Sequence, residues 1–411
     1  MGACAARARA NASPLISGTA LAAYGHGDWN DALQPADPAM RENMCSAWTV
    51  TLHHQTLTTL ARALRQVGRQ PAAQRLERQA EAVRRDFLRL LLVDDVLAGY
   101  ALFEPEPRAR EAGDTARDGH GRVLRIRYLL HPRDETTGVR YSVLAMIHAI
   151  LEGLFDRAQL QHHLRLIDEH LTGTDGARLF DWPLAYHGGP QRNFQRAESA
   201  SFFGREIGLM YMHAHLRYAQ ALAHIGQAER FLHALCQANP IGLREIVPTA
   251  TLRQSNCYYS SSDAKFADRY QASDEYERVR RGTIDLDGGW RVYSSGAGIL
   301  YSLVVRQLLG LRLEAEALLI DPVLPPALDG LCVEAVLLGQ PFEISYRVRG
   351  AGCGVVAMQL DGAALEFTEE ANPYRRGAAR VALAEMAIGA DGSRPRRLRI
   401  EVGNPNDEVI E

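Results

Sequence analysis

The stretch CSAWTVTLHHQTLTTLARALRQV, residues 45–67, decides the fold because its apolar side chains recur at the spacing of a helix. Four large side chains share one face: Trp48, Leu52, Leu60 and Leu64. Gly68 ends this predicted helix, and PAAQRLERQAEAVRRDFLRLLL at 71–92 predicts a second one, with Pro71 in its first turn. The two segments together predict a hairpin of helices.

Five more segments show the same helical spacing, and they form adjacent pairs with short turns between them. They cover residues 141–154, 157–171, 202–225, 227–238 and 298–310. Because no alternating strands are expected between them, the pattern predicts stacked helical hairpins and a mainly α fold. Long loops separate these helices, and loops of this length are usually functional. They are predicted at about 104–138, 172–201, 239–272 and 282–296.

The sequence pattern changes near residue 313, where short runs alternate between apolar and polar residues. The runs are LCVEAVLL, PFEISYRVRG, CGVVAMQL and RRLRIEVG. They predict a small antiparallel, β-sandwich-like domain over 313–411 that follows a helical domain over 1–312. Because the C-terminal part contains no cluster of catalytic residue types, we expect it to brace the helical part.

Charge and cysteine content exclude several classes of partner. The 46 basic and 49 acidic residues give a formal net charge of -3, which argues against nucleic acid or an anionic membrane. No run of about 18 apolar residues occurs, so no membrane-spanning helix is expected. The six cysteines lie far apart without a CxxC pair, which is typical of reduced thiols in the cytoplasm. The adjacent pairs His53–His54 and His162–His163 lack the i, i+4 spacing of metal ligands, so no metal site is expected.

The loop GHGDWNDAL, residues 25–33, is the stretch most suggestive of chemistry. It places two carboxylates, Asp28 and Asp31, around Trp29 and Asn30. A lone D-W-N-D sequence is more often a turn or a helix start than a catalytic loop, because Asp and Asn favour both positions. The motifs that follow it along the chain reverse that weighting.

GDWND at 27–31 resembles the catalytic loop of the glycoside hydrolase family 94 phosphorylases, the cellobiose and chitobiose phosphorylase group, which share it with cyclic β-1,2-glucan synthases. Three more stretches follow in the family's order. REIGLMYMHA at 205–214 resembles its R-E-N-G-G-x-x-x-H-A helix, and GGWRVYSSGAG at 288–298 resembles its G-G-W-x-W-Y-T-G-S-A-G loop. LGLRLEAEALLIDPVLPP at 309–326 resembles the exit from the helical barrel into the last β domain.

The family fold is an (α/α)6 barrel that lies between a front β-sandwich and a C-terminal β domain. The resemblance therefore implies an (α/α)6-barrel-like helical toroid over 1–312, followed by the small β domain. The chain has too few predicted helices for a full barrel, so we expect the toroid to be incomplete at its N-terminus. In family members the missing portion supplies an arginine and an aspartate to the sugar beside the cleaved bond.

The resemblance makes Asp31 the catalytic acid of an inverting phosphorolysis. Inverting hydrolases need a second carboxylate to activate water, whereas phosphate is already a nucleophile, so a single acid suffices. The indole of Trp29 is expected to keep Asp31 protonated, because an apolar wall disfavours the charged carboxylate. Asp28 and Asn30 would hold the loop or a sugar hydroxyl, and Trp29 would stack on the sugar.

The second motif implies further ligands for sugar and phosphate. By the resemblance Arg205 and Glu206 bind sugar hydroxyls and His213 contacts phosphate. Glu206 and His213 are seven residues apart, which is about two helical turns and predicts that they share one helix face. The other interpretation of His213 is a hydrogen-bonded core histidine, and the neighbouring His215 is assigned no role.

The third motif predicts a phosphate-binding helix start near Gly298, because backbone N–H groups and the positive helix end favour an anion there. Family members carry Thr-Gly where this chain carries Ser294 and Ser295. Ser294 keeps the hydroxyl, whereas Ser295 adds a side chain that narrows the pocket or changes the backbone angle. Without the resemblance, the same serines are equally typical of a helix cap.

Two polar stretches are weaker candidates for contact with the ligand. The loop at 186–199 combines arginines with aromatic residues, a mixture that suits sugars and phosphates. The residues of interest in it are Tyr186, Arg192, Phe194 and Arg196. The stretch QSNCYYSSSDAKFADRYQ at 254–271 is a candidate for the acceptor end of the site.

The predicted function is inverting phosphorolysis of a β-glucoside to sugar 1-phosphate, with inorganic phosphate as co-substrate and no cofactor. One alternative is glycan processing related to the cyclic β-1,2-glucan synthases. Another is a truncated, non-catalytic fragment that binds carbohydrate. The expected partners are an oligosaccharide and phosphate, and because family members often form dimers, a homodimer is one expected assembly.

Overall fold

The computed structural model describes residues 15–403 except 26, 28–29, 106–114, 118, 120–122, 186–187, 200–209, 290, 292–294, 351 and 388–393. The chain forms two compact units. Unit 1 comprises residues 1–214 and 261–287, and unit 2 comprises 215–260 and 288–411. Within the described ranges, no helix is both long and apolar enough to cross a membrane.

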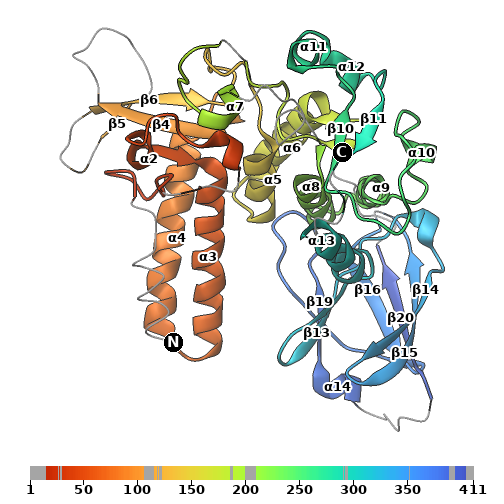
Figure 1. Ribbon diagram of the computed structural model, residues 1–411. Helices are drawn as coiled ribbons and strands as arrows, with labels where there is room; N and C mark the ends of the chain where they lie inside the picture. The colour runs from red at the N-terminus through yellow and green to blue at the C-terminus, as the bar shows by residue number, and fades with distance from the viewer. Residues whose placement is uncertain are drawn as a thin grey trace. The chain divides into compact units, whose positions relative to one another are not determined.

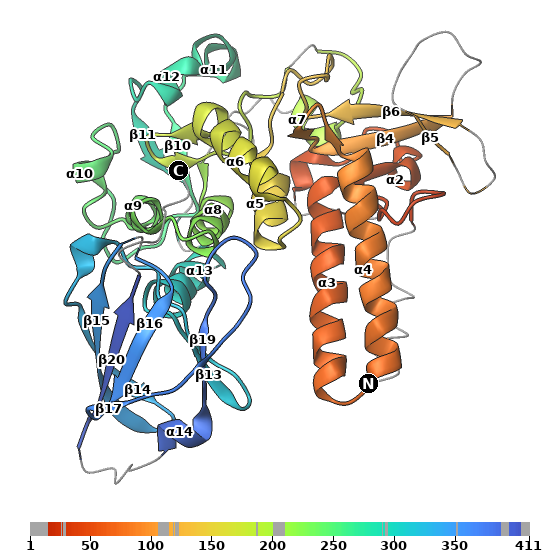
Figure 2. The same cartoon turned by 180° about the vertical axis from the view of Figure 1, so that it is seen from behind.

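The predicted helical hairpin is confirmed and is the largest feature of unit 1 (Figures 1 and 2). It consists of α3 (Ala47–Gln66) and α4 (Gln70–Leu90), which lie side by side in both views. Ser46 precedes α3, and its side chain accepts a hydrogen bond from the backbone of Thr49. Gly68 has a φ of 74°, a left-handed conformation that lets the chain reverse between the helices.

Unit 1 also contains a four-stranded antiparallel sheet, which corrects the prediction of an uninterrupted helical region. Its strand order is β1-β4-β6-β5, formed by β1 (Met44–Ser46), β4 (Tyr100–Pro105), β6 (Val123–Leu129) and β5 (Thr115–Arg117). The prediction of a loop at 104–138 is therefore wrong. The sequence of β6, VLRIRYL, alternates between apolar and charged residues, a pattern typical of a strand that the loop prediction did not use.

The rest of unit 1 is made of short helices and hairpins. The helices are η1 (Asp31–Leu33), α2 (Met40–Asn43), α5 (Val143–Leu151), α6 (Arg157–Leu166), η2 (Ile167–Leu171), α7 (Gln195–Ser199), α11 (Arg269–Glu275) and α12 (Glu277–Arg280). Two small hairpins pair β2 (Leu92–Val93) with β3 (Val96–Leu97), and β7 (Thr172–Gly173) with β8 (Gly176–Ala177). Asp156 and Gln159 cap the start of α6 reciprocally.

The helix predicted at 202–225 is shorter in the structure. Its described part begins at α8 (Met212–His224), and Met210–Tyr211 form a strand, β9, that pairs with β10 (Ser261–Ala264). Together with β11 (Leu286–Gly288) they make a three-stranded sheet in the order β11-β10-β9. A pairing partner about 50 residues away thus overrides the helical pattern at Met210 and Tyr211.

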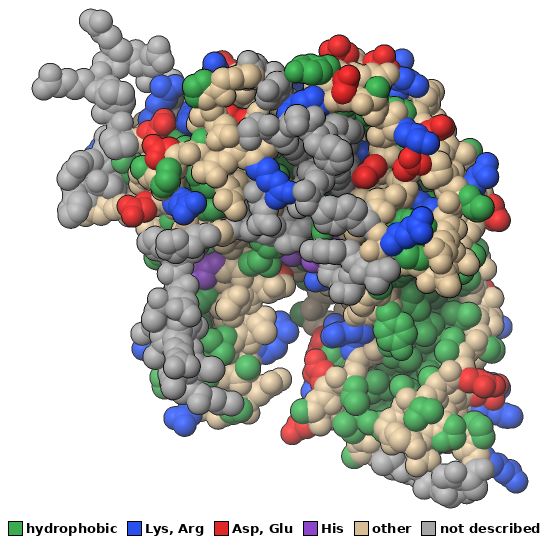
Figure 3. Space-filling view, viewed as in Figure 1, with side chains coloured by type: hydrophobic (Ala, Val, Ile, Leu, Met, Phe, Trp, Pro, Cys, Tyr) green, Lys and Arg blue, Asp and Glu red, His purple; other side chains and the backbone are tan. Residues whose placement is uncertain are grey.

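Unit 2 combines helices with the C-terminal β domain. Its helices are most of α8, then α9 (Ala228–Ala238), α10 (Leu243–Ile246), α13 (Ser295–Leu303), η3 (Val304–Leu308), η4 (Pro326–Leu328) and α14 (Leu383–Ala387). Figure 3 shows hydrophobic side chains on the face of this unit, and Tyr301 of α13 is 73% exposed. The predicted change from helix to strand is confirmed, with the first strand of the β domain starting at Leu311.

Two sheets form the β domain. One has the order β12-β13-β19-β18, from β12 (Leu311–Leu313), β13 (Ala317–Ile320), β19 (Ala379–Ala382) and β18 (Thr368–Glu369). The other has the order β14-β15-β20-β16-β17, from β14 (Cys332–Leu337), β15 (Gln340–Val348), β20 (Arg396–Val402), β16 (Val355–Leu360) and β17 (Ala363–Ala364). The β15–β20 pairing is parallel, so the prediction of a purely antiparallel domain is wrong at that pair.

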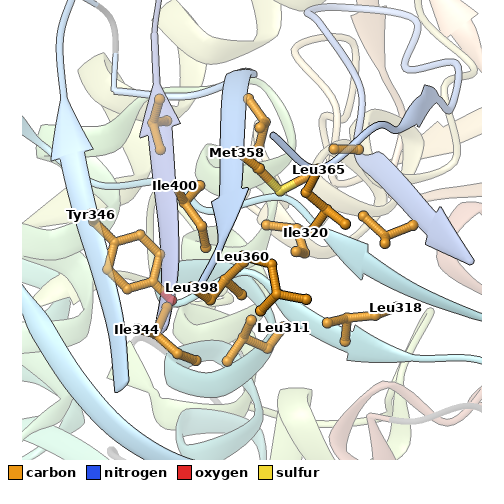
Figure 4. Close-up of a cluster of buried hydrophobic side chains, with 14 of the residues drawn as sticks. Leu311, Leu318, Ile320, Ile344, Tyr346, Met358, Leu360, Leu365, Leu398 and Ile400 are labelled. Atoms are coloured by element: carbon orange, nitrogen blue, oxygen red, sulfur yellow. The ribbon is translucent and has the colours of Figure 1, made fainter. Parts of the chain in front are cut away.

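The core of the β domain is a continuous apolar cluster (Figure 4). Side chains from both sheets enter it, including Ile320, Ile344, Met358 and Ile400. Tyr346 is the polar member, and its hydroxyl donates a hydrogen bond to the Leu309 carbonyl at 2.8 Å. In β15 and β20 the buried side chains alternate with more exposed ones, so strand alternation predicts which face of these two strands is buried.

Candidate active-site loop

The predicted catalytic loop, residues 25–33, belongs to the described structure except for His26, Asp28 and Trp29. Asn30 is 3% exposed and caps η1, because its Oδ1 accepts a hydrogen bond from the Ala32 N–H at 3.0 Å. Asp31 is the first residue of η1, and its side chain lies outside the described residues, as do Asp28 and Trp29. The structure thus places the predicted acid on a short helix turn that a buried asparagine fixes.

The loop after η1 is paired with a distant segment of unit 1. The Ala36 N–H donates to the Asn193 carbonyl at 2.8 Å, and the Gln195 N–H donates to the Gln34 carbonyl at 2.8 Å. Pro35 and Phe194 form the bridge between these two bonds. Residues 34–36 and 193–195 therefore pair as a short antiparallel ladder beside the predicted acid.

A small pocket of about 20 Å³ lies beside η1, large enough for about one water molecule. Asn30 and Leu33 line it from the loop, and the other lining residues are Ser46, Trp48, Gly99, Tyr100, Ser142, Leu144, Ala145 and Phe180. The amide nitrogen of Asn30 has no hydrogen-bond partner among the described residues. A water molecule or a ligand hydroxyl would satisfy this buried donor.

The aromatic residue of the 186–199 loop packs into the protein core. Phe194 is 0% exposed, and its ring packs edge-on against Tyr100 at 5.3 Å between centroids. Its interpretation as a sugar-facing aromatic is therefore wrong. Arg192 is exposed and Arg196 is half-buried, whereas Tyr186 lies outside the described residues.

The argument that Glu206 and His213 share one helix face is wrong. The strand β9 at Met210–Tyr211 interrupts any helix between the two positions, and α8 begins only at Met212. His213 is half-buried in the first turn of α8, whereas Arg205 and Glu206 lie outside the described residues. His215 is 0% exposed and its Nε2 lies 2.8 Å from the Ala234 carbonyl, so it is a core histidine.

The glycine-rich third motif is packed against two tyrosines of unit 2. A β-carbon at Gly288 would overlap the ring of Tyr259, and one at Gly296 would overlap the hydroxyl of Tyr258. Both tyrosines belong to the 254–271 stretch, so part of this stretch lies against the start of α13. Ser295 is the first residue of α13, three residues before the predicted start, and its side chain lies outside the described residues, as does Ser294.

A buried ion pair lies at the β7–β8 hairpin of unit 1. Arg178 and Asp175 are 2% and 1% exposed, and one guanidinium nitrogen lies 2.9 Å from both carboxylate oxygens. Burial raises the pKa of Tyr276 beside them to about 12, which keeps its hydroxyl protonated. No group of three His, Cys, Asp or Glu side chains suited to a metal ion occurs among the residues that the structure describes.

Sequence reasoning missed Glu198 and Asn193, which hold the segment paired with the η1 loop. The Glu198 carboxylate accepts hydrogen bonds from the N–H groups of Arg192, Asn193 and Phe194 at 2.6, 2.9 and 2.9 Å. The only signal for them was their position in a long polar loop, which does not reveal a backbone contact.

Comparison with known proteins supports the family resemblance. Residues 310–390 match the family described as "Glycoside phosphorylase C-terminal domain". A 1,2-beta-oligoglucan phosphorylase from Listeria innocua serovar 6a is 40% identical over 365 residues, which cover 89% of this chain. The chain spans 31% of the length of that relative. The resemblance to glycoside phosphorylases is thereby confirmed.

Similarity to solved structures is weaker. A chain titled "Sialidase" aligns with a TM-score of 0.45 and 12% identity, covering 83% of this chain and 27% of that one.

Proposed function

We propose that this chain carries the catalytic loop and the C-terminal part of a glycoside phosphorylase that cleaves a β-glucan by inverting phosphorolysis. The observation that carries the proposal is the 40% identity to a phosphorylase over 89% of the chain, a span that includes most of the described structure. The family match at 310–390 supports it independently of the loop motifs.

Asp31 is the proposed acid, which protonates the glycosidic oxygen while phosphate attacks the opposite face of the sugar. The cap by Asn30 supports this role, because it fixes the backbone of η1 where the acid is attached. Trp29, Asp28, Arg205 and Glu206 are the proposed sugar ligands together with Asn30. His213, Ser294 and Ser295 are the proposed phosphate ligands. The proposed chemistry uses inorganic phosphate as co-substrate and needs neither a cofactor nor a metal.

The proposed substrate class is β-1,2-linked glucan oligosaccharide. The relative is named as a 1,2-beta-oligoglucan phosphorylase, and its identity to this chain is high enough to make that linkage the first to test. Glycan processing related to the cyclic β-1,2-glucan synthases would use the same linkage. A non-catalytic module that binds carbohydrate is the alternative from another class.

The helices are proposed to be part of an (α/α)6-barrel-like toroid over 1–312. The successive pairs α3–α4 and α5–α6 in unit 1, and α8–α9 in unit 2, support the proposal because such toroids are built from helical hairpins. We also propose that the protein is located in the cytoplasm and that it forms a homodimer.

The test is release of sugar 1-phosphate from β-1,2-linked gluco-oligosaccharides by the purified full chain in phosphate buffer. Asp31→Asn should lower the rate by at least about a thousandfold while sugar binding persists, because the acid is lost and the loop is kept. Asp37→Asn is the matched control, since Asp37 is exposed a few residues further along the same loop. Sugar binding without any release by the unmodified chain would favour the non-catalytic alternative.

A further inference from the structure

We propose that Glu198 is a positioning residue that holds the η1 loop, and with it Asp31, through the backbone of residues 192–194. Its effect on catalysis rests on the proposed function. Its effect on the loop itself rests only on the contacts of the described residues.

The first step is the carboxylate of Glu198, which gathers three consecutive backbone donors. Its Oε2 accepts from the Arg192 N–H, and its Oε1 accepts from the N–H groups of Asn193 and Phe194. Hydrogen bonds to an ionised acceptor are roughly twice as strong as neutral ones. Three of them on one side chain fix a turn that would otherwise be an open loop.

The second step is Asn193, which is 1% exposed and connects this turn to β6 and to the bend at Thr136. Its Oδ1 accepts from the Arg127 guanidinium at 2.6 Å, and its Nδ2 donates to the Thr136 hydroxyl at 2.9 Å. Its carbonyl accepts from the Ala36 N–H at 2.8 Å. The residue that Glu198 orients is thus the same one that bonds to the η1 loop.

The third step is the short ladder between 193–195 and 34–36. Figures 1 and 2 both show α7 against the red segment that contains η1, and the two elements are in contact. Only two residues, Ala32 and Leu33, separate Asp31 from the residue that accepts the Gln195 N–H. A displacement of the ladder therefore moves the backbone of Asp31, and a shift of about 1 Å at a reacting group can lower a rate by about a hundredfold.

The other interpretation is that Glu198 only stabilises its own turn, since α7 has five residues. The local role and the positioning role differ in which segment changes when Glu198 is substituted. A purely local role changes the stability of α7 and leaves the η1 loop in place. A positioning role changes the exposure of the Leu33 and Ala36 amides and the rate of the chemical step.

The test compares Glu198→Gln with Glu104→Gln in the full chain. Glutamine has the shape of glutamate but presents an N–H to a backbone N–H, so at least one of the three bonds is lost. Glu104 pairs with the same Arg127 guanidinium at 3.5 Å, whereas the three backbone bonds of the turn go to Glu198, which makes Glu104 the matched control. Thr136→Val is a milder variant that removes the acceptor of the Asn193 amide, together with the hydrogen bond that the Thr136 hydroxyl donates to Asp134.

The expected result has two parts. Hydrogen exchange of the peptide that covers 30–36 becomes faster in Glu198→Gln, to a smaller extent in Thr136→Val, and stays unchanged in Glu104→Gln. The kcat for phosphorolysis falls about tenfold in Glu198→Gln with KM within about twofold, because the acid and not the sugar site is displaced. Exchange within α3 stays as in the parent protein, which excludes a global loss of stability.

Unchanged exchange in 30–36 would overturn the proposal, and so would faster exchange with an unchanged kcat. A parent chain that releases no sugar 1-phosphate refutes the proposed function instead. In that case the exchange measurement alone still decides whether Glu198 holds the loop.

Discussion

The loops of unit 1 and the core of the β domain in unit 2 are held in different ways. In unit 1, buried or half-buried carboxylates bind backbone N–H groups, as Asp181 does for Arg140 and Tyr141 and Glu198 does for residues 192–194. In the β domain, alternating apolar side chains from two sheets fill one core. Hydrogen bonds from backbone N–H groups to a carboxylate, here called polar anchoring, hold a loop at a few residues. Apolar packing holds whole strands.

The difference affects how each region responds to substitution. Removal of one partner of a buried ion pair lowers the unfolding free energy strongly, because the charge of the other partner stays buried and uncompensated. A truncated apolar side chain leaves a cavity into which its neighbours relax only in part. Three measurements test this contrast, and they are taken from the largest expected effect to the smallest.

The largest effect is expected from Asp175→Asn in unit 1. The substitution removes the negative charge from a pair in which both residues are almost fully buried, so the Arg178 guanidinium loses the carboxylate that lies 2.9 Å from it. Breaking a pair of this kind costs about 3–5 kcal/mol of unfolding free energy. Chemical denaturation measures it, and Asp94→Asn is the control because its pair with Arg133 is exposed and in the same unit. Equal effects of the two substitutions would contradict the role given to burial.

A slightly smaller effect is expected from Ile344→Ala in the β domain. Ile344 is 0% exposed in the centre of the apolar cluster, and truncation of a buried isoleucine costs about 2–5 kcal/mol. Val336→Ala on the neighbouring strand is the matched control, because Val336 is 73% exposed. Thermal unfolding should show a lowered midpoint for the first variant and an almost unchanged one for the second. A large loss in Val336→Ala would show that the outer face of β14 is covered.

The same contrast explains which features could be predicted from the sequence. Periodicity depends on neighbouring residues, so it predicted the α3–α4 hairpin and the four main strands of the five-stranded sheet. It failed at Met210–Tyr211, where a strand partner about 50 residues away overrides the helical pattern. It also failed at β5 and β6, because the polar stretch at about 104–138 was interpreted as a loop although the apolar residues of β6 alternate.

The candidate site could be proposed only through motifs. The GDWND motif ends at Asp31, the first residue of η1, and the glycines of the third motif lie against tyrosines. The hydrogen bonds of Glu198 and Asn193 could not be predicted from the sequence. Asn193 accepts a hydrogen bond from Arg127, which is 66 residues away in the sequence, and a local sequence pattern does not indicate such a contact. Polar anchors of this kind depend on tertiary geometry, whereas apolar alternation is local.

The smallest effect on the unfolding free energy is expected when the pH is lowered. The measurement compares one buried histidine in each unit. Burial lowers the pKa of His163 in unit 1 and of His224 in unit 2 to about 4. For His224 the nearby Arg375 guanidinium adds to the effect of burial on the pKa. The environments differ, because His163 accepts from the Leu97 N–H at 3.3 Å and its Nδ1 lies 2.7 Å from the Gln159 carbonyl. His224 Nε2 has no hydrogen-bond partner among the described residues.

Both histidines should make the protein less stable in acid. The folded pKa of about 4 lies below the ordinary value of 6.5, so the unfolded chain binds the proton more readily. The stabilisation is complete above pH 6.5 and is lost as the pH falls from 6.5 toward 4. Each histidine should cost about 2 kcal/mol of unfolding free energy between about pH 7 and about pH 5.

Denaturant unfolding at several pH values measures this loss for His163→Gln and His224→Gln separately. Each variant should have a flatter pH dependence than the parent protein, because glutamine does not titrate. At neutral pH His163→Gln should also be the less stable of the two, since the imidazole of His163 is hydrogen-bonded on both sides. If His224→Gln were instead the more damaging variant at neutral pH, polar anchoring would not be what separates unit 1 from unit 2. The contrast between the two units would then rest on apolar packing alone.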